Sequence, residues 1–575
     1  MKTRQIPTHF AAFATPALFE SPLLHRIRLA MQRGRNYPLD SLDFILADLE
    51  RPATLIRHAD FCTGDLSGRY LDFLAAGQHI DAADADRMHR LFERILANQQ
   101  PNGTFVGEGH ARQGVWDAAY KLFMGLLRYY LRTGNGKALV AAQRNADYIF
   151  ANLKTIRDAC KNRRLPGIYM WVVEPMALLY GITGDGRCLD VCRMIAEAIP
   201  KTIDGCHSHG LMTTLRGLQF AALYTGDTTW NELPERMRRE IADRAVWPDG
   251  NIPEIFPASG RNEGCSIADW IMLNLYAGFI TGRDEAYQNA ENALHNALFL
   301  NQIVNGGFGH RNLAADRCGY GESSLTSEAW WCCLHNAGLA MVEFAAHAVT
   351  LREDELRVNL FVPGTYTLQH EGRTVSATID TRYPETADAV ITVTGAPAAM
   401  TTHIRIPGCI AYPVIDTTNL PGGGIRYRLH GRLGYRLETC DRGTLLRYGP
   451  LVLAPLRYSD SGADKASQVQ DMLQGYIPEE IRERRPAIVA GEADADGFVH
   501  YPKEPRPVWN NFEEGAHSRL AYDNLSVNVP LAFADGTVKE QRFLPLCYST
   551  TTLHCESVCL PVVFAAEVSK EAKQV

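Results

Sequence analysis

Residues 116–135 read WDAAYKLFMGLLRYYLRTGN, and this stretch sets the pattern for the first half of the chain. Its apolar side chains recur in steps of mostly three and four, which is typical of one buried helix face. They are Trp116, Ala119, Tyr120, Phe123, Leu126, Leu127 and Tyr130. The stretch ends in Thr133-Gly134-Asn135, where glycine can end one helix and the polar residue after it can cap the next.

The same turn recurs three more times, each time after an apolar helical stretch. The copies are Thr183-Gly184-Asp185, Thr225-Gly226-Asp227 and Thr281-Gly282-Arg283. Their glycines and Gly134 are separated by 50, 42 and 56 residues, the length of one helix pair with its connections. The first half therefore predicts a repeat of helical hairpins. We expect a closed toroid of helix pairs, and an open solenoid is the competing arrangement.

After residue 350 the apolar period drops to two, and Pro and Gly separate the segments. The predicted strands lie at 357–362, 374–380, 389–393 and 403–406, and again at 526–529 and 552–555. Short strands at this spacing indicate antiparallel β-sandwich domains. We predict an α plus β protein with a helical domain over 1–350, a β-sandwich over 351–458, and a connector with a C-terminal β domain over 459–575.

Composition narrows the class of protein. The 575 residues are 46% hydrophobic and 21% charged, which is typical of globular domains and excludes a disordered chain. Lys and Arg number 58 against 65 Asp and Glu, a net charge of −7, which predicts no nucleic-acid partner and no membrane surface. No apolar run reaches the ~20 residues of a membrane span, and no signal peptide is predicted.

The 14 cysteines are mostly scattered, far too few for a disulfide scaffold. A reducing compartment, the cytoplasm, is therefore expected. The sequence leaves open whether the chain forms a homodimer.

Two short segments concentrate metal-binding side chains. Glu263 and Cys265 lie 67 residues before the vicinal pair Cys332-Cys333, counted from Cys265 to Cys332. Residues i and i+2 of an extended segment point to the same side, and zinc favours thiolates with one carboxylate or imidazole. A zinc site is one interpretation. Ordinary buried thiols and a surface glutamate are the other.

These segments also carry a family resemblance. Residues 263–270 (EGCSIADW), with 281–287 and 290–296, resemble the E-x-C segment, turn and helix of glycoside hydrolase family 127, the retaining β-L-arabinofuranosidases. Residues 332–336 (CCLHN) resemble that family's C-C-P-P-N, and 356–363 its strand L-Y-V-N-L-Y-I-P. Weaker likenesses lie at 99–103, 405–409 and 448–452. The similarity runs from about residue 55 to 456.

The resemblance implies an (α/α)6 barrel followed by β-sandwich domains. It also implies a Zn²⁺ ion held by Glu263, Cys265, Cys332 and Cys333, with Cys332 as the nucleophile of a retaining glycosidase. Such a mechanism also needs a carboxylic acid that protonates the leaving oxygen and later acts as base.

The sequence departs from the family pattern at the position expected for this carboxylic acid. The expected position, sixteen residues before Glu263, is Trp247. A loop shortened by seven residues would put Glu254 in the role, which we favour. Glu322, ten residues before Cys332, is the rival, and a plain loop carboxylate remains the alternative for both.

Four further residues are predicted to contact the substrate. His207 and His209 fall where the family has G-H-A-V-R, and Asp65 matches a D-x-D-like segment. Trp116 stands where the family helix begins H-E-L-Y, and the missing histidine leaves the identity of the sugar open.

The leading hypothesis is thus a zinc-thiolate retaining glycosidase with a carbohydrate substrate. One alternative is another helical-toroid enzyme that uses paired carboxylates, such as an unsaturated uronyl hydrolase. A non-catalytic sugar-binding protein with a structural zinc is the other.

Overall fold

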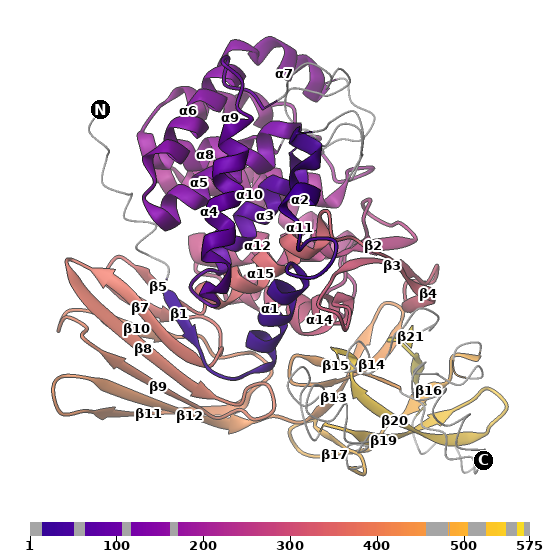
Figure 1. Ribbon diagram of the computed structural model, residues 1–575. Coiled ribbons are helices and arrows are strands. Elements are labelled where there is room, and N and C mark those ends of the chain that lie inside the picture. Colours follow the sequence, from indigo (N-terminus) through magenta and orange to yellow (C-terminus); the bar gives the residue numbers. More distant parts are fainter. Residues whose placement is uncertain are drawn as a thin grey trace.

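The computed structural model describes residues 14–50, 64–105, 117–161, 171–455, 481, 484–503, 525–547 and 560–568. The helices gather in one domain, and two regions of β-strands lie beneath it (Figure 1). The last long helix ends at Ala346, and a strand begins at Val349. The predicted change from helix to strand near residue 350 is confirmed.

Six helices contact one another in a closed ring, because the last of them packs against the first. In ring order they are α3 (Asp65–Gly77), α5 (Asp117–Thr133), α8 (Val173–Thr183), α10 (Ser208–Thr225), α12 (Gly264–Thr281) and α15 (Cys333–Ala346). In α10 every side chain from Ser208 to Leu223 is buried, and α12 is equally enclosed. A helix that is buried on all sides has to be surrounded by other elements.

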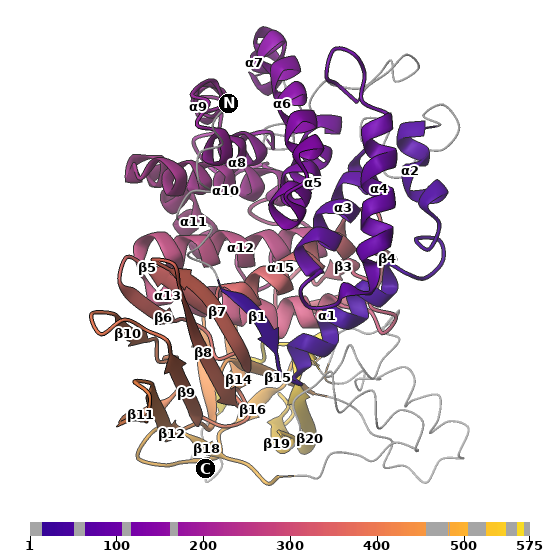
Figure 2. The ribbon, with the colours of Figure 1, turned by 60° about the vertical axis from the view of Figure 1, so that its left-hand side comes forward.

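The remaining α-helices lie outside this ring, and most of them are amphipathic. They are α1 (Pro22–Arg33), α2 (Leu42–Glu50), α4 (Ala85–Ala97), α6 (Gly136–Ala151), α7 (Leu153–Lys161), α9 (Arg187–Ala196), α11 (Glu232–Arg244) and α13 (Asp284–Asn292), which continues into η4 (Ala293–Leu298) and α14 (Phe299–Asn301). In α4 only Met88, Leu91, Phe92 and Ile95 are buried, one stripe at helical spacing. Figure 2 shows these helices outside the ring.

The four Thr-Gly-X turns end four consecutive ring helices, as the sequence predicts. Gly134, Gly184, Gly226 and Gly282 have φ between 71° and 75°, the left-handed region that favours glycine. In each turn the threonine hydroxyl donates to the carbonyl four residues earlier and accepts from the backbone N–H two residues later. Each of these four ring helices therefore stops in the same local structure before the chain turns back.

The first β region contains two sheets. A six-stranded sheet has the order β1 (Thr15–Leu18), β7 (Gly364–His370), β8 (Arg373–Thr381), β9 (Ala389–Thr394), β12 (Ile425–Arg432) and β11 (Ala411–Asn419). A three-stranded sheet has the order β10 (Thr401–Ile404), β6 (Glu355–Val358) and β5 (Val349–Arg352). Buried and exposed side chains alternate along β7, β8 and β9, which confirms the period of two. Strand β1 joins this sheet from within the range predicted to be helical.

The second β region is one nine-stranded sheet. Its order is β17 (Glu492–Ala493), β18 (Val499–His500), β13 (Tyr435–Cys440), β14 (Gly443–Tyr448), β15 (Leu451–Pro455), β20 (Val538–Pro545), β19 (Val527–Ala532), β16 (Ala487–Val489) and β22 (Ala565–Val568). The pairing is mostly antiparallel, as predicted, but β10 with β6 and β16 with β22 are parallel. The predicted strand at 552–555 lies outside the described residues.

A small sheet covers one end of the helical ring. It consists of β2 (Arg261–Glu263), β3 (Gly309–Leu313), β4 (Gly319–Glu328) and β21 (Leu560–Pro561). Strand β2 leads directly into α12, so this sheet holds the residues just before that ring helix. In the described parts of the chain, no helix is long and apolar enough to cross a lipid bilayer.

Candidate active site

Four side chains from two distant segments meet at the beginnings of α12 and α15. One ligand atom from each of Glu263, Cys265, Cys332 and Cys333 lies within 4.8 Å of all the others, and all four residues are buried. The two vicinal sulfur atoms are 3.6 Å apart and unbonded. Because zinc–sulfur bonds are about 2.3 Å long, tetrahedral ligands lie roughly 3.8 Å apart, so this donor set suits a zinc-sized ion.

Burial makes the ionised forms of these groups costly. Burial raises the pKa of Cys265 and Cys333 well above the usual thiol range, and neighbouring Glu263 adds to that rise. Burial alone would also raise the pKa of Glu263, but contact with His310 and nearby His207 and His209 hold it below its usual range. Three thiolates beside a carboxylate would need a cation among them, and a divalent metal ion would supply that charge.

The thiols lie where two ring helices begin. Cys332 is the residue before α15, Cys333 is its first residue, and Cys265 is in the first turn of α12. Helix N-termini favour negative charge, so both helix dipoles stabilise thiolates at this position. Ser266 donates to Oε1 of Glu263 at 3.2 Å and orients that carboxylate.

Glu254 lies beside this cluster. Its carboxylate, that of Glu263 and the imidazole of His207 each offer an atom within 4.8 Å of the other two. Arg261 donates two hydrogen bonds to Glu254, at 2.5 and 2.7 Å. These two charge-assisted hydrogen bonds hold the carboxylate of Glu254 in place next to Glu263 and His207.

The side chains of two other predicted site residues, Glu322 and Trp116, lie outside the described residues. Glu322 lies in β4, but its side chain is outside the described residues. Trp116 precedes α5 and is also outside them.

His207 takes one defined orientation next to the cluster. Its Nδ1 accepts from the backbone N–H of Gly210 at 3.2 Å and caps α10. The hydrogen therefore resides on Nε2, which lies 3.6 Å from Oε1 of Glu263. His207 can present an N–H donor to a group bound near Glu263.

His209 is occupied by protein partners instead. Its Nδ1 is hydrogen-bonded to the carboxylate of Asp269, and its Nε2 lies 3.2 Å from Nη2 of Arg69. A carboxylate only accepts and a guanidinium only donates, so His209 carries its hydrogen on Nδ1. Burial lowers the pKa of His209. Both nitrogens are engaged, and His209 orients Arg69 rather than facing an open space.

Asp65, the first residue of α3, is paired in the same network. Its Oδ1 accepts from Nε of Arg69 at 2.8 Å, and both residues are only 2% exposed. Nη1 of Arg69 is buried and has no hydrogen-bond partner among the residues that the structure describes. Asp65 and His209 thus fix a guanidinium group that keeps one donor uncommitted.

Three residues of the site were missed from the sequence. His310 on β3 lies 3.6 Å from Oε2 of Glu263, and Asp269 binds both His209 and Arg216. Arg69 is the third. The Asp65–Arg69 spacing of one helical turn was a usable signal for Arg69, whereas His310 follows no pattern near the other ligands.

A buried carboxylate and three thiols at the beginnings of two ring helices form a cluster with the donor set of a metal site. A model of the family described as β-L-arabinofuranosidase, GH127 catalytic domain, matches residues 46–345. The chain belongs to glycoside hydrolase family 127, and it is an enzyme that hydrolyses glycosidic bonds of carbohydrates.

Solved structures share the whole fold. A GH127 β-arabinofuranosidase has a TM-score of 0.69 at 13% identity over 97% of each chain. Ara127N, a GH127 β-L-arabinofuranosidase from Geobacillus stearothermophilus T6, has the same score and identity over 96% of this chain and 100% of its own. At this identity the likeness establishes the fold alone. No curated protein matches the sequence significantly.

Proposed function

We propose that this enzyme is a retaining β-L-arabinofuranosidase in which Cys332 is the nucleophile. The observation that carries the proposal is the buried cluster of Glu263, Cys265, Cys332 and Cys333. Membership of a family described by that activity supports the choice of sugar. We further propose that the six ring helices, each with its peripheral helices, are an (α/α)6 barrel, supported by their closed order of contacts.

Glu263, Cys265, Cys332 and Cys333 would hold the metal ion, and we propose zinc because thiolates favour it. When bound, zinc keeps the Cys332 sulfur deprotonated at neutral pH. With these four residues as ligands, the ion would have no position left for water, so the water in the second step has to be activated by a side chain. The three thiols must stay reduced, which suits a reducing compartment.

In the first step, the Cys332 sulfur attacks the anomeric carbon and forms a carbon–sulfur bond. The bond from that carbon to the leaving oxygen breaks, and a carboxylic acid donates its proton to this oxygen. His207 and Arg69 each offer an N–H donor near the cluster for sugar hydroxyl groups.

In the second step, water attacks the same carbon and gives its proton to the carboxylate, while the sulfur leaves as a thiolate. Two inversions give net retention. Glu254 is our choice for this residue because it lies beside Glu263 and His207. The hydrogen bonds from Arg261 to Glu254 suit its role as the base of this second step. For Glu254 to act as the acid of the first step, Arg261 has to release its carboxylate. Glu322 is the alternative acid.

The test is hydrolysis of p-nitrophenyl β-L-arabinofuranoside, with zinc counted by elemental analysis. We expect about one zinc per chain in the active wild type, and a loss of roughly 1,000-fold or more in kcat for Cys332→Ala. Cys188→Ala, a buried thiol on α9, is the matched control and should keep activity and zinc. Near-normal turnover of Cys332→Ala would contradict the nucleophile, and fully active zinc-free protein would contradict the metal.

A further inference from the structure

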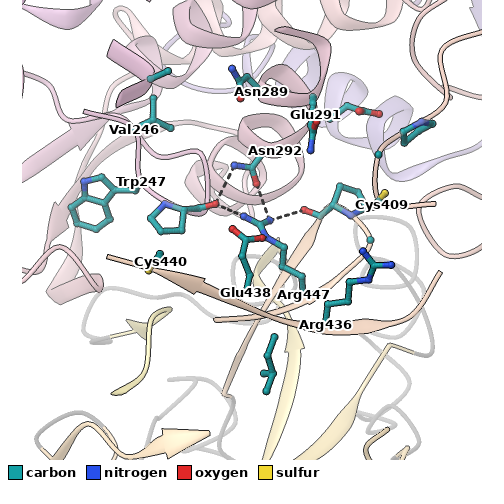
Figure 3. Close-up of a pocket in the computed structure, with 18 of the residues that line it drawn as sticks. Val246, Trp247, Asn289, Glu291, Asn292, Cys409, Arg436, Glu438, Cys440 and Arg447 are labelled. Atoms are coloured by element: carbon teal, nitrogen blue, oxygen red, sulfur yellow. Dashed lines mark hydrogen bonds and ion pairs between the residues drawn. The ribbon is translucent and has the colours of Figure 1, made fainter. Parts of the chain in front are cut away.

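A polar cleft separates the helical domain from the nine-stranded sheet, outside the cluster of thiols. It has a volume of about 650 Å³, which is in the range of small-ligand sites. One wall is formed by α13 and by the segment after α11, and the other by β13 and β14 (Figure 3).

Part of this cleft is built rigidly. Arg447 on β14 donates to Oδ1 of Asn292 at 3.0 Å and to the carbonyl oxygen of Pro248, and it pairs with Glu438 at 2.6 Å. Asn292 also donates to the Pro248 carbonyl at 3.1 Å. These bonds join the two walls, as the dashed lines in Figure 3 show. These hydrogen bonds therefore hold the two walls of the cleft in a fixed position.

Other polar groups in the cleft are uncommitted. Arg436 stands directly opposite Arg447 in the β13–β14 register, a pairing of like charges that is unfavourable without a partner. Its guanidinium stacks on Phe498 at 4.4 Å, but its Nε is buried and no residue in the described part of the chain accepts from it. On the facing wall, Gln288 is exposed, and Asn289 donates only one long bond, 3.4 Å, to Asn274.

The chemistry of these groups selects a polyhydroxyl ligand. Amide and guanidinium groups on facing walls offer both donors and acceptors, which vicinal hydroxyls can satisfy together. Charges in the lining nearly balance, because Glu291, Glu438 and Asp441 stand against Arg436 and Arg447. The cleft therefore favours neither a strongly anionic ligand nor a cationic one.

The cleft is also joined to the catalytic end of the ring. Pro248, whose carbonyl oxygen links both walls, lies in the segment that leads to Glu254. The next residue, Asp249, accepts from the hydroxyl of Tyr320 on β4 at 2.8 Å. A glycan held in the cleft would therefore lie on the segment that carries a proposed catalytic carboxylate.

We propose that this cleft is a second carbohydrate-binding site, which takes a neutral oligosaccharide and uses Arg436 as its central donor. It rests on the family's action on glycosides, and it deepens the proposed function by adding a site for a part of the glycan that is not cleaved.

The experiment is calorimetric titration of the intact protein with arabinotriose, xylotriose, galactotriose and trigalacturonate. At least one neutral trisaccharide should bind, and Arg436→Gln should weaken that binding fivefold or more, with Arg436→Lys in between. Arg428→Gln, an exposed arginine on β12, is the matched control and should stay within twofold. All variants should keep the melting temperature of the wild type.

Absence of binding by all three neutral sugars, or equal binding by Arg436→Gln, would overturn the proposal. Binding of trigalacturonate alone would overturn the neutral class of ligand. Hydrolysis of the aryl furanoside by the wild type separates the two proposals, because it tests the proposed function without using the cleft. If the wild type binds a trisaccharide through Arg436 but does not hydrolyse the aryl furanoside, the proposed function is contradicted. The proposal of a second binding site then still stands.

Discussion

Arg69 lies close enough to Cys265 and Cys332 that negative charge on either sulfur raises the pKa of its guanidinium. Two of its nitrogens are bound by Asp65 and His209, and Nη1 is left as a buried donor. A buried donor without a partner costs about 1–3 kcal/mol, so such a group usually has a partner in the working state of the protein. A bound sugar hydroxyl or a thiolate sulfur would satisfy it.

The first prediction concerns this donor. Arg69→Gln should lower kcat/KM for the aryl furanoside by roughly 10- to 100-fold, because about 1–3 kcal/mol of hydrogen bonding to a charged group is lost. Arg69→Lys should recover only part of the loss, since a lysine cannot bind Asp65 and His209 and keep a directed third donor. Steady-state kinetics with zinc content measured alongside is the check.

Arg90→Gln is the matched control for Arg69, because Arg90 forms an exposed ion pair with Asp86 at 2.9 Å on α4. It should stay within twofold of wild type. If Arg69→Gln has normal kcat/KM at full zinc content, Nη1 has no role in the reaction.

At the scale of elements, neighbouring ring helices approach so closely that glycine is required between them. A Cβ on Gly217 of α10 would lie 2.6 Å from the backbone nitrogen of Glu174 and 2.8 Å from the carbonyl carbon of Val173. Both atoms belong to the first turn of α8, close to the catalytic end. A Cβ on Gly68 of α3 would lie 2.3 Å from the carbonyl carbon of Lys121 on α5. These contacts set the spacing of the ring.

The second prediction is that Gly217→Ala destabilises the protein by about 1–3 kcal/mol, because the added methyl group overlaps backbone atoms that cannot move alone. In an unobstructed helix the same change would stabilise by up to about 1 kcal/mol. Gly136→Ala provides that comparison, since nothing lies within 4 Å of the added Cβ at the start of α6. Denaturant unfolding measures both, and equal stability of the two variants would refute the close contact.

At the scale of the whole molecule, one buried ion pair joins the helical domain to the first β region. Arg405, after β10, pairs with Glu291 on α13 and also donates to the carbonyl of Asn359 at 2.5 Å. Arg405 is 2% exposed and Glu291 3% exposed. One hydrophobic core continues across this boundary from the ring helices into β7, β8 and β9. The two regions therefore unfold together in our interpretation.

The third prediction is that Glu291→Gln lowers the free energy of unfolding by about 3–5 kcal/mol, because it leaves Arg405 buried without its counter-charge. Replacing both residues by methionine should recover much of that loss. Glu285→Gln is the control on the same helix: its carboxylate is 58% exposed and should matter little. A single cooperative urea transition is expected, and a wild-type transition in two steps would contradict coupled unfolding.

Local patterns in the sequence determined the elements of this protein. The four Thr-Gly-X turns specify where ring helices end, because threonine, glycine and the residue after them complete the turn among themselves. The period of two after residue 350 specifies strands for the same reason, since it depends only on neighbours along the chain. The E-x-C and Cys-Cys pairs also identified four side chains that do meet.

Only the tertiary structure decided what surrounds those side chains. Closure of the ring brings Arg69, His209 and Asp269 together from three helices, and β3 delivers His310 to Glu263. The cleft around Arg436 likewise depends on segments that pack across domains. Such contacts are set by the close packing of distant surfaces, and no spacing along one segment of the chain encodes them.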